Sequence, residues 1–397
     1  MKTGPVTQLL RTLWPRVDPY EVVGVLREQD PASVAALLAE LPALSGPDAA
    51  TRLMVPVADA LATRSPADRV EALHALDALV RGGGDPSAIL PAAAATLPHR
   101  KTRRAAERLL RRAALKGWSL LSLDLPEPTG KDLSARQIYR LAALQRRGLE
   151  PAVCTLGIIY DRQPISNMHE SLALVEEQLL SGDRASAQAA LAGLTAAGAD
   201  LYRCWLALLP VLTSQLRDGA WQNEAACALG QLRYTPRYAV GLSEAQVAQD
   251  VAPRLGEVMA VLAGVLRVRR VVAQSAAQTL WNFAALGVPL DAVRAELEGA
   301  LSSPDATVRS RCSGALSEWL VRSGQEPPLP RGCSHRRRFA ASDTPLEGGG
   351  TVRCLACGVE GAQVLYSHED ISQTHADIMA EARCAACGVY SEHRWGY

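Results

Sequence analysis

The sequence predicts a mainly α-helical protein with a small β-rich module at its C-terminal end. From about residue 6 to residue 322, apolar residues recur at intervals of three and four, in segments of roughly 12–20 residues, as on the buried face of a helix. Alanine and leucine dominate and only two phenylalanines occur, which favours closely packed helices over sheets. After residue 330 the pattern shortens into β-prone stretches separated by glycine turns.

The composition is that of a soluble protein with an apolar core. The chain has 397 residues, of which 48% are hydrophobic, and 42 basic against 41 acidic residues give a formal net charge of +1. At roughly 100–200 residues per domain, this length allows two or three domains. A charge so close to zero argues against binding nucleic acid or a membrane over the whole surface. No run of about 18 apolar residues predicts a membrane span, and the amphipathic N-terminal segment does not resemble a secretory signal.

Turn-forming residues separate the predicted helical segments. Several breaks place proline or an acidic residue at the start of the next segment, where the free N–H groups and the positive end of the helix dipole favour them. These breaks are Asp30-Pro31, Gly46-Pro47, Ser65-Pro66, Gly182-Asp183, Asp218-Gly219 and Ser303-Pro304-Asp305. We find no alternation of period two before residue 330, so this region is predicted to be entirely helical.

Several of these helical segments share one pattern, in which small residues and leucine line one face. The clearest copies are residues 221–232, 272–281 and 308–316, and weaker copies are residues 69–79, 103–110 and 185–194. The pattern resembles the second helix of HEAT-type repeats. The resemblance covers about four-fifths of the chain and implies an α-solenoid, in which each helix pair hides its apolar face only by stacking on its neighbours. A compact irregular helical bundle is the alternative, because the spacing between copies is irregular.

A proline-rich segment divides the chain into unequal parts. The helical pattern stops at Ser-Gly-Gln-Glu-Pro-Pro-Leu-Pro, which ends at Pro330. We therefore predict a helical-repeat domain over residues 1–322, a linker over residues 323–332 and a separate module over residues 333–397. The β-prone stretches of this module are residues 351–354, 362–366 and 389–391.

Two near-identical cysteine pairs stand in the C-terminal module. The sequences Arg-Cys-Leu-Ala-Cys-Gly-Val and Arg-Cys-Ala-Ala-Cys-Gly-Val differ only in their third residue. A Cys-x-x-Cys turn directs two sulfurs at one metal ion, and the glycine after it adopts the positive φ angle that such a turn requires. Cys354 and Cys357 with Cys384 and Cys387 can thus supply four thiolates to a tetrahedral zinc ion. The pattern resembles the zinc-ribbon family of structural modules.

An arrangement with two zinc ions is also open. Cys333 and His335 precede the first cysteine pair and would complete one site with it. The second pair would complete another site with two of three nearby histidines, which are His368, His375 and His393. We favour two sites over one, since a free cysteine two residues from a histidine would otherwise be an unexplained reactive pair. The candidate zinc ligands are therefore Cys333, His335, Cys354, Cys357, Cys384 and Cys387.

We expect the zinc to be structural. A module of about 65 residues holds little apolar core, so metal binding supplies its folding energy. Catalytic zinc leaves one coordination position to water and needs a general base. Acidic residues occur in the module, but none stands in a known catalytic zinc motif. A redox dithiol is the third interpretation, and it is disfavoured because the cysteine pairs do not lie in a βαβ pattern.

Residues 99–116 form the most one-sided charge cluster of the chain. On a helix, the alanines and leucines of this segment face inward, while a separate stripe comprises Arg100, Arg104, Arg108 and Arg112. Such a stripe is a candidate for binding nucleic-acid phosphates. We prefer to interpret it as the solvated outer face of an arginine-rich helix, because charge runs alone are weak indicators.

The common enzyme signatures do not occur in the sequence. We find no phosphate-binding loop, nucleophile elbow or dinucleotide-binding fingerprint. We therefore predict a non-enzymatic scaffold that binds protein partners through its helical repeats and carries a structural zinc module, with no membrane anchor and no small-molecule substrate. The alternative is a nucleic-acid-binding protein that uses residues 99–116 and the zinc module, and the third hypothesis is an enzyme whose site is assembled from distant positions. A thiolate metal site in place of disulfides favours the cytoplasm, and the Ala-, Arg- and Leu-rich composition favours a bacterium with a GC-rich genome.

Overall fold

The structure is a computed structural model, in which the chain forms two compact units, residues 1–198 and residues 199–397. It describes residues 5–13, 19–26, 30–63, 65–125, 136–162, 168–238, 241–268, 270–336, 350–371 and 376–396.

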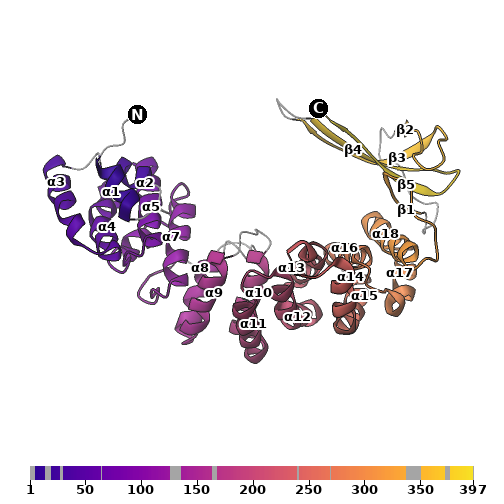
Figure 1. The fold of residues 1–397 in the computed structure, drawn as a ribbon, viewed down its shortest axis with the longest axis horizontal. Coiled ribbons are helices and arrows are strands. Elements are labelled where there is room, and N and C mark those ends of the chain that lie inside the picture. Colours follow the sequence, from indigo (N-terminus) through magenta and orange to yellow (C-terminus); the bar gives the residue numbers. More distant parts are fainter. Residues whose placement is uncertain are drawn as a thin grey trace. The chain divides into compact units, whose positions relative to one another are not determined.

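The described part of the first unit is built from helices, drawn from indigo to magenta in Figure 1. Its α-helices are α1 (Pro5–Leu13), α2 (Pro19–Leu26), α3 (Pro31–Glu40), α4 (Gly46–Thr63), α5 (Pro66–Arg81), α6 (Leu90–Ala94), α7 (Arg103–Leu115), α8 (Gln137–Arg146), α9 (Glu150–Arg162), α10 (Met168–Ser181) and α11 (Arg184–Ala197). A short 3₁₀-helix, η1 (Leu41–Ala43), follows α3. Helix α5 packs between α4 and α7, α7 also packs on α8 and α9, and α10 packs on α11.

The second unit begins with helices and ends in a sheet. Its α-helices are α12 (Leu201–Asp218), α13 (Gln222–Gly230), α14 (Glu244–Val251), α15 (Gly256–Val265), α16 (Arg270–Leu286), α17 (Arg294–Ala300) and α18 (Ala306–Arg322). Its 3₁₀-helices are η2 (Gln231–Tyr238), η3 (Ala252–Arg254) and η4 (Asp291–Val293). Helix α13 packs on α12 and α16, and α16 packs on α18. Among the described helices of both units, none combines the length and the apolarity that crossing a membrane requires.

Side-chain caps explain where many helices begin. In each cap, a side-chain oxygen accepts a hydrogen bond from a backbone N–H group of the first helical turn. This interaction contributes about 1 kcal/mol to helix stability. The capping residues are Asp30, Ser65, Asp183, Asp200, Ser243 and Asp305. Four of them, all but Asp200 and Ser243, stand at breaks that the sequence predicts.

Glycine sets the distance between some packed helices. Gly157 of α9 lies against the end of α7, where an added Cβ would lie 1.9 Å from the carbonyl oxygen of Leu115. Gly314 of α18 lies against α16, where an added Cβ would lie 2.7 Å from Cε2 of the Trp281 ring. Both helix pairs therefore depend on a residue without a side chain at the point of contact.

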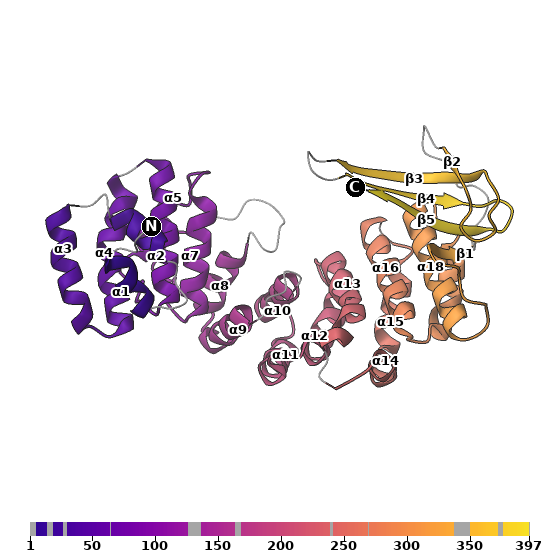
Figure 2. The ribbon, with the colours of Figure 1, turned by 45° about the horizontal axis from the view of Figure 1, so that its top comes forward.

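The sheet is antiparallel and has the strand order β1-β5-β4-β3-β2 (Figure 2). Its strands are β1 (Cys333–Arg336), β2 (Thr351–Val352), β3 (Ala362–Ile371), β4 (Ala376–Arg383) and β5 (Val389–Gly396). Strands β3 and β4 form a hairpin in which Gln363 pairs with Arg383. The sheet is attached to the helices of its unit, since β1 packs on α18 and the Ser310 hydroxyl of α18 donates to Glu381 of β4 at 3.4 Å.

The prediction of a mainly α-helical protein with a small β module is confirmed. The stretches predicted as β overlap β2, β3 and β5, whereas β1 and β4 were not predicted. Strand β4 contains three alanines together with a methionine, a glutamate and an arginine, all of which favour helices. It is extended because it pairs with β3 on one side and β5 on the other, which overrides its local preference. The predicted domain boundaries stay a prediction, and the predicted linker lies inside the second unit.

Candidate metal centre

The first cysteine pair lies in a tight turn between β2 and β3. The N–H of Gly358 donates to the carbonyl of Cys354 at 2.9 Å, and the N–H of Cys354 donates to the carbonyl of Val359 at 2.9 Å. Gly358 has a φ angle of +75°, which glycine adopts without a steric penalty. The guanidinium of Arg353 donates to the carbonyl of Gly358 at 3.1 Å, and this exposed hydrogen bond stabilises the turn.

The second pair, between β4 and β5, repeats this geometry. The N–H of Gly388 donates to the carbonyl of Cys384 at 2.8 Å, and the N–H of Cys384 donates to the carbonyl of Val389 at 3.0 Å. The φ angle of Gly388 is +69°. The two near-identical sequences thus form two near-identical turns, each of which projects two sulfurs to one side.

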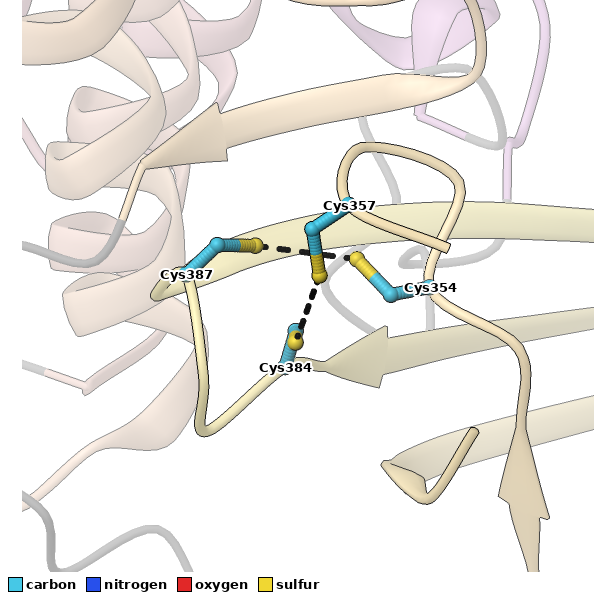
Figure 3. Close-up of side chains that lie close together, drawn as sticks. All are labelled: Cys354, Cys357, Cys384 and Cys387. Atoms are coloured by element: carbon cyan, nitrogen blue, oxygen red, sulfur yellow. Dashed lines mark hydrogen bonds between the residues drawn. The ribbon is translucent and has the colours of Figure 1, made fainter. Parts of the chain in front are cut away.

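The four sulfurs of the two turns meet at one point (Figure 3). All of them lie within 4.8 Å of one another. The sulfurs of Cys354 and Cys387 are 3.6 Å apart, as are those of Cys357 and Cys384. A tetrahedral ion with bonds of about 2.3 Å to sulfur spaces its ligand sulfurs by about 3.8 Å, whereas a disulfide bond is about 2.0 Å long. The spacing therefore fits four ligands around one metal ion and does not fit two disulfides.

The reason that the turns meet is the register of the β3–β4 hairpin. Because Gln363 pairs with Arg383, the turn that precedes β3 and the turn that follows β4 lie side by side. The first cysteine of each turn, Cys354 and Cys384, is buried beside Ala362 and Ala382, and the second cysteine of each turn is exposed. The ion would thus lie at the edge of a very small apolar cluster.

Electrostatics also favour a cation here. Burial raises the pKa of the Cys354 thiol, but the N–H groups of Cys357 and Ala356 donate to its sulfur, and together with the neighbouring thiols they lower the pKa to about 7. Burial raises the pKa of Cys387 to about 12 in spite of the N–H of Val389. Four thiolates at this spacing repel one another, and a divalent ion supplies the charge that offsets the repulsion. Since four sulfurs complete a tetrahedral shell, the site leaves no position for a reacting water.

The two-site arrangement that we favoured from the sequence is not the one in the structure. It assigns the two cysteine pairs to different ions, whereas the hairpin register brings them together. Cys333 lies in β1, opposite Ser391, and does not belong to the cluster. His393 bonds the hydroxyl of Ser391 at 2.9 Å and also lies outside the cluster. The side chains of His335 and His368, and the whole of His375, lie outside the described residues.

The predicted arginine stripe lies along α7 and the turn before it. Arg100, Arg104 and Arg108 are exposed. Arg112 is half-buried and forms an ion pair with the buried carboxylate of Asp77 in α5. One member of the stripe is therefore already neutralised, by a residue that the sequence did not single out.

Comparison of the chain with family models, with curated proteins and with solved structures gives no match.

Proposed function

We propose that the protein is a non-catalytic scaffold whose helix pairs, similar to HEAT repeats, bind a protein partner, while a structural zinc ion folds its C-terminal sheet. The observation that supports it best is the closed set of four thiols, which suits zinc and leaves no open coordination position. The repeated pattern of small residues at helix contacts, such as Gly314 against Trp281, supports the likeness to HEAT repeats.

A groove in the second unit is the surface we propose for the partner. It has a volume of about 810 Å³ and lies between the end of α15 and the turn that precedes α18. Val268 in its wall is 70% exposed, and Val271, three residues further along the chain, is 60% exposed, which is unusual for valine in a folded protein. Arg267 stands exposed in the same wall. These features suit a partner segment with an apolar side chain next to an acidic one.

The zinc proposal is tested by metal analysis on the purified full-length chain. We expect one zinc ion per chain, and cobalt substitution should give the absorption bands of a tetrahedral thiolate site. Cys384→Ser should lose the metal, and Cys333→Ser, the matched control outside the cluster, should keep it. Two ions per chain, or loss of metal from Cys333→Ser, would contradict a single site.

The scaffold proposal is tested on a partner identified by cross-linking in the source cells and then purified. Val268→Asp together with Val271→Asp should weaken binding by at least about tenfold, and the binding of the unaltered chain should survive nuclease treatment. Leu121→Asp, at a residue of the first unit that is 48% exposed, is the matched control and should bind normally. Unchanged binding by the double variant would exclude this groove.

Nucleic acid is the second candidate partner, supported by the exposed Arg100, Arg104 and Arg108. If this candidate is correct, affinity for DNA or RNA falls steeply with salt, and Arg104→Glu weakens it whatever the base sequence. Binding that is insensitive to salt would exclude it.

A further inference from the structure

A small cavity in the first unit is lined mainly by cationic side chains. It encloses about 130 Å³ between the second half of α7, the end of α9 and the start of α10. Its polar wall consists of Arg108, Arg111, Arg112, Lys116, Tyr160, Asp161 and His169. The three arginines recur at intervals of three and four along α7 and therefore share one face of the helix.

The carboxylates beside the cavity do not balance these cations. Asp77 forms its ion pair with Arg112, and Asp161 also approaches Arg112, at 3.9 Å. Four cationic side chains thus stand against three carboxyl groups, which are Asp161, Asp77, shared with Arg81, and the buried Glu176. The wall keeps an excess of positive charge, and two of its cations, Arg108 and Lys116, are exposed to solvent.

Arg111 and Lys116 donate to neutral groups. Arg111 donates to the side-chain oxygen of Gln137 at 3.1 Å, and Lys116 donates to the carbonyl of Val80 at 2.8 Å. Burial lowers the pKa of Arg111, and repulsion from Arg112 and Arg108 contributes to the lowering. A bound anion would offset the repulsion among these cations and would raise the pKa of Arg111 again.

His169 adds a second and independent indication of a ligand. Its Nδ1 atom is buried and has no hydrogen-bond partner among the described residues. The His169 ring stacks on Tyr160, with the ring centroids 5.2 Å apart. The hydroxyl of Tyr160 in turn donates to the buried carboxylate of Glu176 at 3.0 Å, which fixes the stacked pair. An unpaired buried nitrogen costs free energy unless a ligand pairs with it.

We propose that this cavity binds the phosphate group of a phosphomonoester. Arg108 and Arg111 would supply guanidinium donors, and His169, with its proton on Nδ1, would supply a third after a small shift of its ring, because Nδ1 is closed off from the cavity. Guanidinium groups match the geometry of phosphate oxygens, and a phosphomonoester carries a charge near −2, which complements the excess charge of the wall. At about 30 Å³ per water molecule, the cavity has room for a group the size of phosphate, so the rest of the ligand would lie outside it.

The test is a calorimetric titration of the full-length chain, at low salt, with inorganic phosphate, with adenosine monophosphate and with a short oligonucleotide that has no terminal phosphate. We expect saturable binding of one monoester per chain. Arg108→Gln should weaken it at least about tenfold, because this side chain lines the cavity. Arg104→Gln is the matched control, since Arg104 is exposed one turn earlier on the same helix and outside the cavity. His169→Phe keeps the ring stack but removes the nitrogen, and should also weaken binding about tenfold.

The outcomes separate the sources of the phosphate. Tighter binding of the monophosphate than of inorganic phosphate would assign the site to a phosphorylated molecule, and equal binding would assign it to phosphate itself; either supports the proposal. No saturable binding up to about 10 mM of either probe would overturn it. Equal losses from Arg108→Gln and Arg104→Gln, normal binding by a folded His169→Phe, or preference for the oligonucleotide would also overturn it. Thermal melting of each variant establishes that it is folded.

Discussion

The helices and the C-terminal sheet are stabilised in different ways. In α5 of the first unit, Leu73, Leu76 and Leu79 are completely buried against neighbouring helices. Similar apolar side chains are buried on the other long helices that the structure describes. Among the described residues of the sheet module, one apolar cluster contains Ala362 and Ala382 with two buried cysteines, and Ala380, Val389 and Tyr390 are also buried. The helices thus bury many large apolar side chains and the described part of the sheet buries few, so under the zinc proposal the ion would supply the folding energy that the sheet lacks. Perturbations that act on one region should leave the other intact.

Removal of the metal is the perturbation with the largest expected effect. Binding of a structural zinc ion contributes on the order of 10 kcal/mol to the folding of a small module. Chelation, or Cys384→Ser, should therefore abolish hydrogen-exchange protection in β3, β4 and β5 while α5 keeps its own. Protected strands in the metal-free protein would show that the sheet folds without an ion. That result would contradict the proposed difference between the sheet and the helices.

Gly157→Ala is the corresponding test for the helices. The new Cβ would overlap the carbonyl oxygen of Leu115, at 1.9 Å, and backbone cannot move aside as a side chain can. We expect α7 and α9 to separate, with a loss of about 3 kcal/mol in the unfolding free energy of the first unit. Denaturant unfolding measures this loss. Metal content should stay unchanged, and loss of zinc from this variant would indicate that the two regions are coupled.

Glu176 is an exception to the apolar core of the helices. Its side chain is completely buried, one carboxylate oxygen has no partner among the described residues, and burial raises its pKa to about 7 from an ordinary value of 4.5. The folded state holds this proton more tightly than the unfolded chain, so the stability of the first unit should fall as pH rises from about 4.5 to 7 and then level off.

Glu176→Gln removes the charge but keeps the oxygen that accepts from Tyr160. We expect the variant to match the unaltered chain near pH 5 and to exceed it by up to about 3 kcal/mol near pH 8. Melting of the first unit at both pH values measures the difference. A stability difference that does not change with pH would show that Glu176 is ionised in the folded state.

The smallest effect is expected at Gly264 in α15. This glycine is exposed, and no atom lies within 4 Å of an added Cβ. Gly264→Ala should stabilise the second unit by about 0.5–1 kcal/mol, because alanine loses less backbone entropy on forming a helix. It is also the control for Gly157→Ala. A destabilising effect of Gly264→Ala would show that overlap of the new Cβ with Leu115 does not explain the loss of stability in Gly157→Ala.

The sequence by itself determined the features that depend on neighbouring residues. Helix starts at Asp30, Asp183 and Asp305 were predictable because a cap bonds N–H groups only two or three residues away. The two cysteine turns were predictable for the same reason, since each closes within six residues on a glycine of positive φ.

The tertiary structure decided the features that join distant residues. The meeting of the two cysteine pairs follows from the β3–β4 register, and β4 is a strand only because its neighbours pair with it. The neutralisation of Arg112 by Asp77 and the cavity beneath α7 likewise join helices far apart in the sequence. Spacing along a chain limits which groups can meet locally, but the packing of whole elements decides which distant groups do meet.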